Sequence, residues 1–84
     1  MKKFKAEIDV MLHPDILDPQ GKAVTGSMKN LNLSEIENVR IGKHITLDII
    51  AVNKDDASQK VEIACNRLLA NLVMEKYTYS LTEK

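Results

Sequence analysis

The sequence predicts a single α+β domain in which one mostly antiparallel sheet carries two helices on one face. Apolar and polar residues alternate at the beginning, in the middle and at the end of the chain, as is typical of half-buried strands. Between these segments, apolar residues recur at the spacing of amphipathic helices. The expected order is therefore strand, helix, one or two strands, helix, strand, within one domain over residues 1–84.

The first strand and the first helix have clear boundaries in the sequence. The strand ends at His13-Pro14, because proline cannot donate a hydrogen bond to a neighbouring strand. Asp18 followed by Pro19 predicts a helix cap and a first helical residue, and loss of such a cap costs about 1 kcal/mol. The apolar face of the strand comprises Phe4, Ala6, Ile8, Val10 and Leu12, and the helix runs from about Pro19 to Leu31 through Val24 and Met28.

Gly21 and Gly26 weaken this helix, each by about 1 kcal/mol relative to alanine. A glycine also allows another backbone to approach closely, which is one reason for its presence in a helix.

The second half of the chain returns to strand and helix patterns. Residues 39–52 keep their apolar residues at odd positions through Gly42-Lys43-His44, which favours one bent strand or a bulged pair and leaves both open. The polar residues 53–56 predict a cap for a second helix, which ends near Ala70-Asn71. Its apolar stripe comprises Ala57, Val61, Ala64, Cys65, Leu68 and Leu69, and a last strand places Tyr77, Tyr79 and Leu81 on one face.

Composition excludes several classes of function. Lys and Arg together number 12, as do Asp and Glu, so the formal net charge is zero. That balance argues against a nucleic-acid-binding protein and against a polybasic membrane anchor. A single cysteine and the lack of a long apolar run predict a cytoplasmic protein. A chain of this length buries only about 60% of its unfolded surface, so oligomerisation is expected to supplement a thin core.

No residues in the sequence predict catalysis, a bound cofactor or a metal site. A glycine-rich phosphate loop, paired cysteines and a nucleophile elbow are all absent. His13 and His44 stand on separate segments, and Cys65 lies on an apolar helix stripe where a thiol is usually buried. Arg40 and Lys43 flank Gly42 and could bind a phosphate or a partner's carboxylate, although their spacing alone favours a solvated strand face.

Three short motifs resemble the PurS-type small subunit of phosphoribosylformylglycinamidine synthase. Leu17-Asp18-Pro19-Gln20-Gly21 is similar to the LDPQG that opens the first helix of that family, and Val39-Arg40-Ile41-Gly42-Lys43 to its VRIGK or VRVGK. The third motif resembles the ending C-X-X-LLAN-X-V-X-E-X-Y and comprises Cys65, Leu68-Leu69-Ala70-Asn71, Val73, Glu75 and Tyr77. The sequence departs from the family at His44, Met74 and Lys76, where tyrosine, isoleucine and an acidic residue are common.

The resemblance implies a PurS-like fold, a relative of the ferredoxin-like fold, and a subunit without catalytic residues of its own. Such subunits form dimers or tetramers and bridge a PurL-type synthetase and a PurQ-type glutaminase, assisting ammonia transfer between them. The assembled enzyme uses ATP, Mg and glutamine, and no cofactor is expected on this subunit. By resemblance, the partner interface comprises Asp18, Pro19, Gln20, Gly21, Arg40, Gly42, Lys43 and Asn71. The alternative is a regulatory module that binds a small ligand on a ferredoxin-like sheet.

Overall fold

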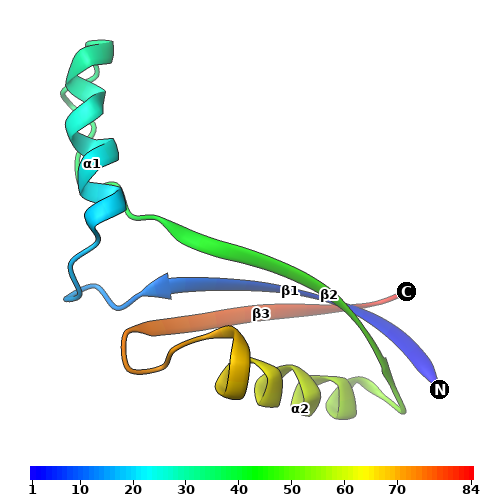
Figure 1. The fold of residues 1–84 in the computed structure, drawn as a ribbon. Helices are drawn as coiled ribbons and strands as arrows, with labels where there is room; N and C mark the ends of the chain where they lie inside the picture. The colour runs from blue at the N-terminus through cyan, green and yellow to red at the C-terminus, as the bar shows by residue number, and fades with distance from the viewer.

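The computed structural model describes residues 1–84 and contains one antiparallel sheet with the strand order β2-β1-β3. The predicted order of strands and helices is confirmed. Along the chain the elements are β1 (Lys2–Leu12), α1 (Pro19–Met28), the 3-10 turn η1 (Lys29–Leu31), β2 (Gly42–Ala51), α2 (Lys54–Ala64), the π-helical turn η2 (Cys65–Leu69) and β3 (Glu75–Glu83). Both termini lie at the end of the sheet far from α1 (Figure 1).

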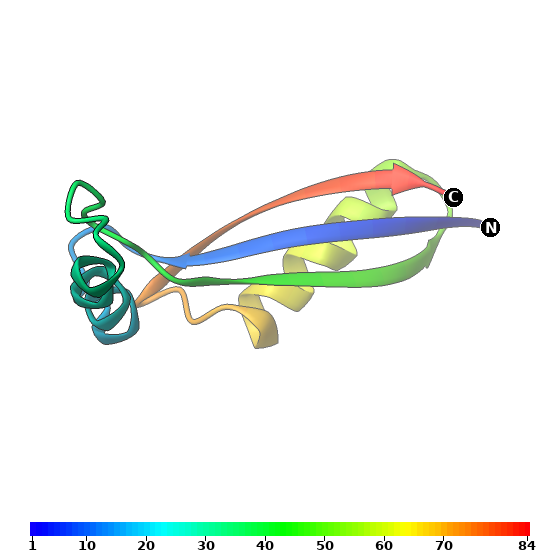
Figure 2. The same ribbon diagram turned by 90° about the horizontal axis from the view of Figure 1, so that it is seen from above.

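The core lies between α2 and one face of the sheet. The alternation of β1 is confirmed, because Phe4, Ala6, Ile8 and Val10 are buried while the residues between them are exposed. Helix α2 links β2 to β3 and covers the same face, as Figure 2 shows. It contributes Ala57 and Val61 to the buried cluster, and the following turn η2 contributes Cys65.

The sequence left open whether residues 39–52 form one bent strand or a bulged pair. The structure has a single strand, β2, whose pairing with β1 continues without a break from Lys2 opposite Ala51 to Met11 opposite Gly42. Residues 39–41 precede the strand and belong to no sheet. Gly42 allows β2 to begin close to β1, because a Cβ atom there would overlap the side chain of Met11 and the carbonyl of Val10.

Only one helix covers the sheet, so the expectation that both helices lie on one face was wrong for α1. Residues 13–41 form a protrusion in which α1 rises away from the end of the sheet and an extended segment returns beside it (Figure 1). The reason is topological. Since β1 and β2 are adjacent and antiparallel, the chain between them need not cross the face of the sheet.

The protrusion makes the molecule elongated. Its extents are 52 × 27 × 14 Å and its radius of gyration is 16.6 Å, whereas a compact chain of this length has about 12 Å. The accessible surface of 6046 Å² likewise exceeds by about 1,000 Å² the area expected for a compact chain of 9.5 kDa. An isolated chain therefore exposes surface that a compact fold would bury.

The end of the second helix also differs from expectation. The buried apolar stripe of the second helix was expected to include Leu68, but this residue is 82% exposed. At η2 the helix widens into a π turn, which closes with a hydrogen bond from the Ala70 N–H to the Cys65 carbonyl. The wider turn changes the direction in which the next side chains point, so that Leu69 is half-buried and Ala70 is buried.

Candidate interaction surfaces

Asp18 fastens the base of the protrusion. Its Oδ1 accepts the N–H of Gly21 at 2.9 Å, which confirms the predicted helix cap. Its Oδ2 accepts the N–H of Ile41 at 2.7 Å, a bond across 23 residues that the sequence did not indicate. The residue is only 5% exposed. The N–H of Ile41, and next the N–H of Gly21, hold the pKa of the Asp18 carboxyl below its usual value.

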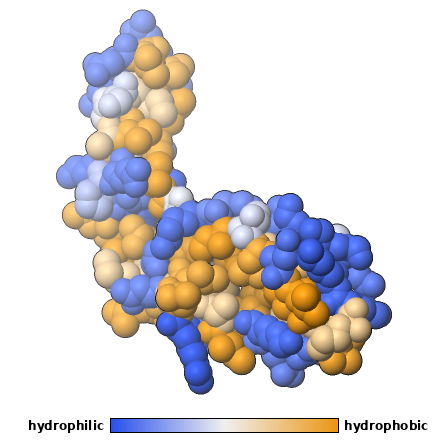
Figure 3. All heavy atoms as spheres, turned by 45° about the vertical axis from the view of Figure 1, so that its right-hand side comes forward, coloured by the Kyte–Doolittle hydropathy of each residue, from blue (hydrophilic) through white to orange (hydrophobic).

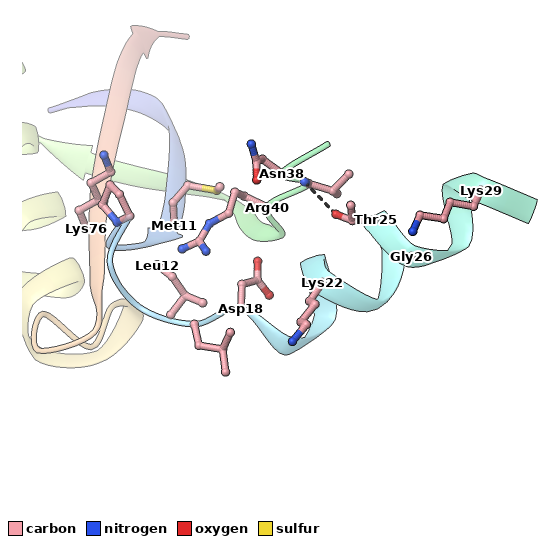
Figure 4. Close-up of a pocket in the computed structure, with 13 residues that line it drawn as sticks. Met11, Leu12, Asp18, Lys22, Thr25, Gly26, Lys29, Asn38, Arg40 and Lys76 are labelled. Atoms are coloured by element: carbon pink, nitrogen blue, oxygen red, sulfur yellow. Dashed lines mark hydrogen bonds between the residues drawn. The ribbon is translucent and has the colours of Figure 1, made fainter. Parts of the chain in front are cut away.

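Two further residues join α1 to the segment that returns beside it. A Cβ atom on Gly21 would overlap the carbonyl oxygen of Val39, so the glycine allows two backbones to lie in direct contact. Thr25 bridges the same pair. Its Oγ1 accepts the N–H of Val39 at 3.0 Å (Figure 4), and it donates to the carbonyl of Gly21 at 2.8 Å. The base of the protrusion is thus held both by hydrogen bonds between residues close in the sequence and by contacts between residues far apart in it.

Arg40 has a structural role that was not expected. Its guanidinium donates to the carbonyl of His13 at 3.0 Å and to that of Ile16 at 2.9 Å, and the residue is half-buried. The expectation that Arg40 faces solvent as a strand residue was wrong, because it precedes β2 and strand parity does not apply to it. Because β2 contains no bulge, Lys43 lies on the same face of the sheet as the core residues. It is nevertheless exposed, and its Nζ lies 3.7 Å from Glu75 Oε2.

Arg40→Ala is expected to destabilise the fold, while Lys43→Ala is not. Loss of two hydrogen bonds from a charged donor should cost about 2 kcal/mol, which corresponds to a fall in Tm of about 10 °C. Lys43 makes one exposed ion pair, which is worth at most about 1 kcal/mol. Thermal unfolding of the two single variants separates these effects, and equal Tm values would contradict the structural role of Arg40.

The predicted partner-interface residues gather at one end of the sheet, around the base of the protrusion. A shallow groove of about 420 Å³ is lined by Asp18, Pro19, Gln20, Gly42 and Lys43 among others. Gly21 contacts the lining residue Asp18, and Arg40 immediately precedes the lining residue Ile41. Asn71 is at the same end, because the turn that follows it is bonded to His13. Whether these residues contact a partner stays a prediction.

Asn71 organises the turn between η2 and β3. Its side-chain oxygen accepts the N–H of Val73 at 3.1 Å, and its carbonyl accepts those of Met74 and Glu75. Its own N–H donates to Glu75 Oε1 at 2.8 Å. The end of η2 and this turn together display an apolar surface, here named the apolar turn. Sequence periodicity missed it, because residues 72–74 lie between two elements and Leu68 was expected to be buried. The apolar turn comprises Leu68, Leu72, Val73 and Met74.

A second and larger groove lies along the protrusion (Figure 4). It has a volume of about 780 Å³ and runs from the ends of β1 and β3 past α1 to the returning segment. Its apolar lining includes Leu12, Leu17 and Val39, and its basic side chains are Lys22, Lys29, Arg40 and Lys76. Figure 3 shows hydrophobic side chains exposed along one side of the protrusion. We name the groove of about 780 Å³ the basic groove.

The ionisable side chains elsewhere are arranged for pairing. On the uncovered face of the sheet, His44 Nδ1 lies 2.6 Å from Asp9 Oδ1, and this hydrogen bond raises the pKa of His44.

Burial raises the pKa of the Cys65 thiol, which disfavours the nucleophilic thiolate. The chain contains no group of three or more His, Cys, Asp or Glu placed to hold a metal ion. None of its helices has the length and apolar character needed to span a membrane.

Comparisons with known proteins find one family. The family model described as "PurS: Phosphoribosylformylglycinamidine (FGAM) synthase" matches residues 5–83. The synthase subunit PurS of Synechocystis sp. is 39% identical over 94% of this chain and 79% of its own length. The crystal structure of Bacillus subtilis PurS has a TM-score of 0.83 and 38% identity, covering 95% and 99% of the two chains. A chain in the structure of PurLQS from Thermotoga maritima has a TM-score of 0.84 and 33% identity over 100% of both.

Proposed function

Since the chain belongs to the PurS family and is a subunit of phosphoribosylformylglycinamidine synthase, a ligase of purine biosynthesis, we propose that it acts in that enzyme by docking. The observation that carries this proposal is the exposed surface of the isolated chain, which exceeds that of a compact protein by about 1,000 Å². A standard protein interface buries about 800 Å² on each partner, so the excess is of the size that one interface would cover.

The expected partners are a PurL-type synthetase subunit, a PurQ-type glutaminase subunit and further copies of this chain, in a dimer or a tetramer. The similarity to a chain of the PurLQS structure supports the first two. In this proposal the small subunit bridges the two larger ones and assists the transfer of ammonia between them. They would use ATP, Mg and glutamine, whereas this chain would hold no cofactor and would work in the cytoplasm. The family match favours this function over a ligand-binding regulatory module.

The residues at the base of the protrusion divide between support and contact. Asp18, Gly21 and Arg40 are committed to bonds and close approaches inside the chain, so they shape the surface. Pro19, Gln20, Gly42 and Lys43 are exposed beside them and are available to a partner. Asn71 supports the apolar turn, which offers uncharged side chains at the same end of the sheet. Exposed apolar surface of this kind typically marks a protein-protein contact.

The double variant Leu68→Ser/Val73→Ser is expected to bind the synthetase subunit at least about tenfold more weakly than the wild type. Burial of a Leu or Val side chain contributes about 1.5 kcal/mol or more, and a tenfold change in affinity corresponds to about 1.4 kcal/mol. These side chains are 82% and 85% exposed, so the fold should not change. Binding is measured by calorimetry in ATP, Mg and glutamine, and glutamine-dependent product formation by the mixed subunits should fall in parallel.

Ile50→Ser/Val52→Ser provides the matched control. These two residues are 62% and 61% exposed but lie at the opposite end of the sheet from the apolar turn, so binding should not change. Equal losses for both double variants would contradict a specific contact at the apolar turn. Product formation by this chain alone would refute the docking role itself.

A further inference from the structure

One group on the uncovered face of the sheet combines a histidine with two carboxylates. Glu7 and Asp9 are two residues apart on β1, so both side chains point to this face. His44 is the residue of β2 that pairs with Asp9. Its Nδ1 lies 2.6 Å from Asp9 Oδ1, and its Nε2 lies 3.6 Å from Glu7 Oε1. The imidazole therefore links two positions of β1 to one position of β2.

The contacts of His44 suit the protonated ring. A carboxylate only accepts hydrogen bonds, whereas a neutral imidazole has one nitrogen that donates and one that accepts. In the neutral form, one ring nitrogen would turn its lone pair toward a carboxylate oxygen. The imidazolium instead donates from both nitrogens, and its positive charge lies between the two negative ones. These contacts raise the pKa of His44, and the hydrogen bond to Asp9 is the largest cause.

No other cation of the chain pairs with these two carboxylates. Neither Glu7 nor Asp9 forms an ion pair with a lysine or an arginine. On β3, the residues opposite them are the uncharged Ser80 and Thr78. Helix α2 lies against the other face of the sheet (Figure 2). The remaining ionisable groups of the uncovered face stand at least two residues further along the chain and comprise Lys3, Lys5, Asp48, Lys76 and Lys84. Loss of the His44 proton would thus leave both carboxylates unpaired.

His44 lies close to the base of the protrusion. Strand β2 begins only two residues earlier, at Gly42, and Ile41 just before it donates its N–H to Asp18 Oδ2 at 2.7 Å. The end of a strand opens more easily than its middle, because it has neighbours on one side only. A contact that holds the third residue of β2 against β1 therefore also limits the motion of Ile41, and through Asp18 the motion of α1.

We propose that His44 is a pH-sensitive clamp, whose imidazolium bridges Asp9 and Glu7 and holds the beginning of β2 against β1, and which loosens this end of the sheet when it loses its proton. The bond between Asp18 and Ile41 then opens more often, so the protrusion is held less firmly.

The direction of the pH dependence follows from the raised pKa of His44. The stabilisation is complete below the unfolded value of about 6.5 and is lost as the pH rises through the higher folded pKa. The clamp is therefore closed in mildly acidic solution and open in alkaline solution. Asp18 does not cause this change, because its pKa is lowered and it stays ionised over the whole range.

Titration of the imidazole signals by NMR tests the bridge. The His44 midpoint is expected above the ordinary value of about 6.5, and Asp9→Asn should return it toward that value. Asp48→Asn is the matched control, because it removes the same charge from the same face, where Asp48 pairs with Lys84 and not with His44. It should leave the His44 midpoint unchanged. A midpoint at or below the ordinary value, or one that Asp9→Asn does not lower, would overturn the bridge.

Amide hydrogen exchange tests the clamp itself. In the wild type, the protection factor of the Ile41 amide is expected to fall about threefold between about pH 5.5 and about pH 8.5, a change of the size that one exposed ion pair supports. His44→Gln does not titrate, so its Ile41 protection should be equal at both pH values. In Asp9→Asn the fall should move to lower pH together with the His44 midpoint. The Ala57 amide, which donates to Asn53 at 3.1 Å at the opposite end of the sheet, is the reference.

Two results of this experiment would overturn the clamp even if the bridge forms. One is an Ile41 protection factor that does not change with pH in the wild type. The other is a fall of the same size in His44→Gln, which would assign the pH dependence to a different group. Circular dichroism checks that each variant is folded, as is expected for substitutions at exposed positions.

Discussion

Replacing Gly21 with alanine is expected to lower Tm by about 10 °C or more, the largest effect of adding one methyl group to α1. The added Cβ would lie 2.7 Å from Asp18 Oδ2 and closer still to the carbonyl of Val39. The second of these atoms belongs to the backbone, which cannot rotate aside as a flexible side chain can. The protrusion must open at its base to admit the methyl group, which also disturbs the hydrogen bond between Asp18 and Ile41.

Gly26→Ala is the matched control on the same helix. Nothing lies within 4 Å of a Cβ atom at this position, so only the helix propensity changes. Alanine is favoured over glycine in a helix by about 1 kcal/mol, and Tm should rise by a few degrees. Differential scanning calorimetry of both variants provides the comparison. If Gly21→Ala is as stable as Gly26→Ala, the close contact between α1 and the returning segment does not exist.

Asp18→Ala is expected to lower Tm by about 10 °C, more than the loss of a helix cap alone would cause. The substitution leaves the N–H groups of Gly21 and Ile41 without their acceptor at a buried position. Asp18→Asn keeps one carbonyl oxygen and turns an NH₂ group toward the other donor, so its Tm should fall between those of Ala and the wild type. Unchanged stability together with lost complex formation would show instead that Asp18 contacts a partner.

The contribution of Asp18 should also depend on pH in a defined direction. The N–H groups of Ile41 and Gly21 lower the pKa of the carboxyl in the folded state, so the folded protein favours the carboxylate. This stabilisation is complete above the unfolded pKa of about 4 and disappears as the pH falls through the lower folded pKa. The stability difference between wild type and Asp18→Ala, measured by urea unfolding, should therefore shrink between pH 7 and pH 2. A difference that widens toward low pH would contradict this assignment.

The elements whose signals are local could be predicted from the sequence alone. The period of two in β1 requires only neighbouring residues, and the core face of Phe4, Ile8 and Val10 followed from it. The cap at Asp18 was equally readable, because the carboxylate and the N–H it binds are three residues apart. The first two family motifs marked Asp18, Gly21 and Arg40 as partner-interface residues, which stays a prediction, and gave no sign of the contacts that each of them makes inside the chain.

The positions of those elements in space, and the contacts that the motif residues make, depend on the folded chain. Asp18 reaches Ile41 across 23 residues and Arg40 reaches Ile16 across 24, and no local pattern encodes which distant backbone group a side chain will meet. The placement of α1 likewise depended on β1 and β2 becoming neighbours, since that pairing removes any need for the helix to cross the sheet. The π turn at η2 turned Leu68 outward, because one extra residue in the turn changes the helical phase on which its predicted burial depended.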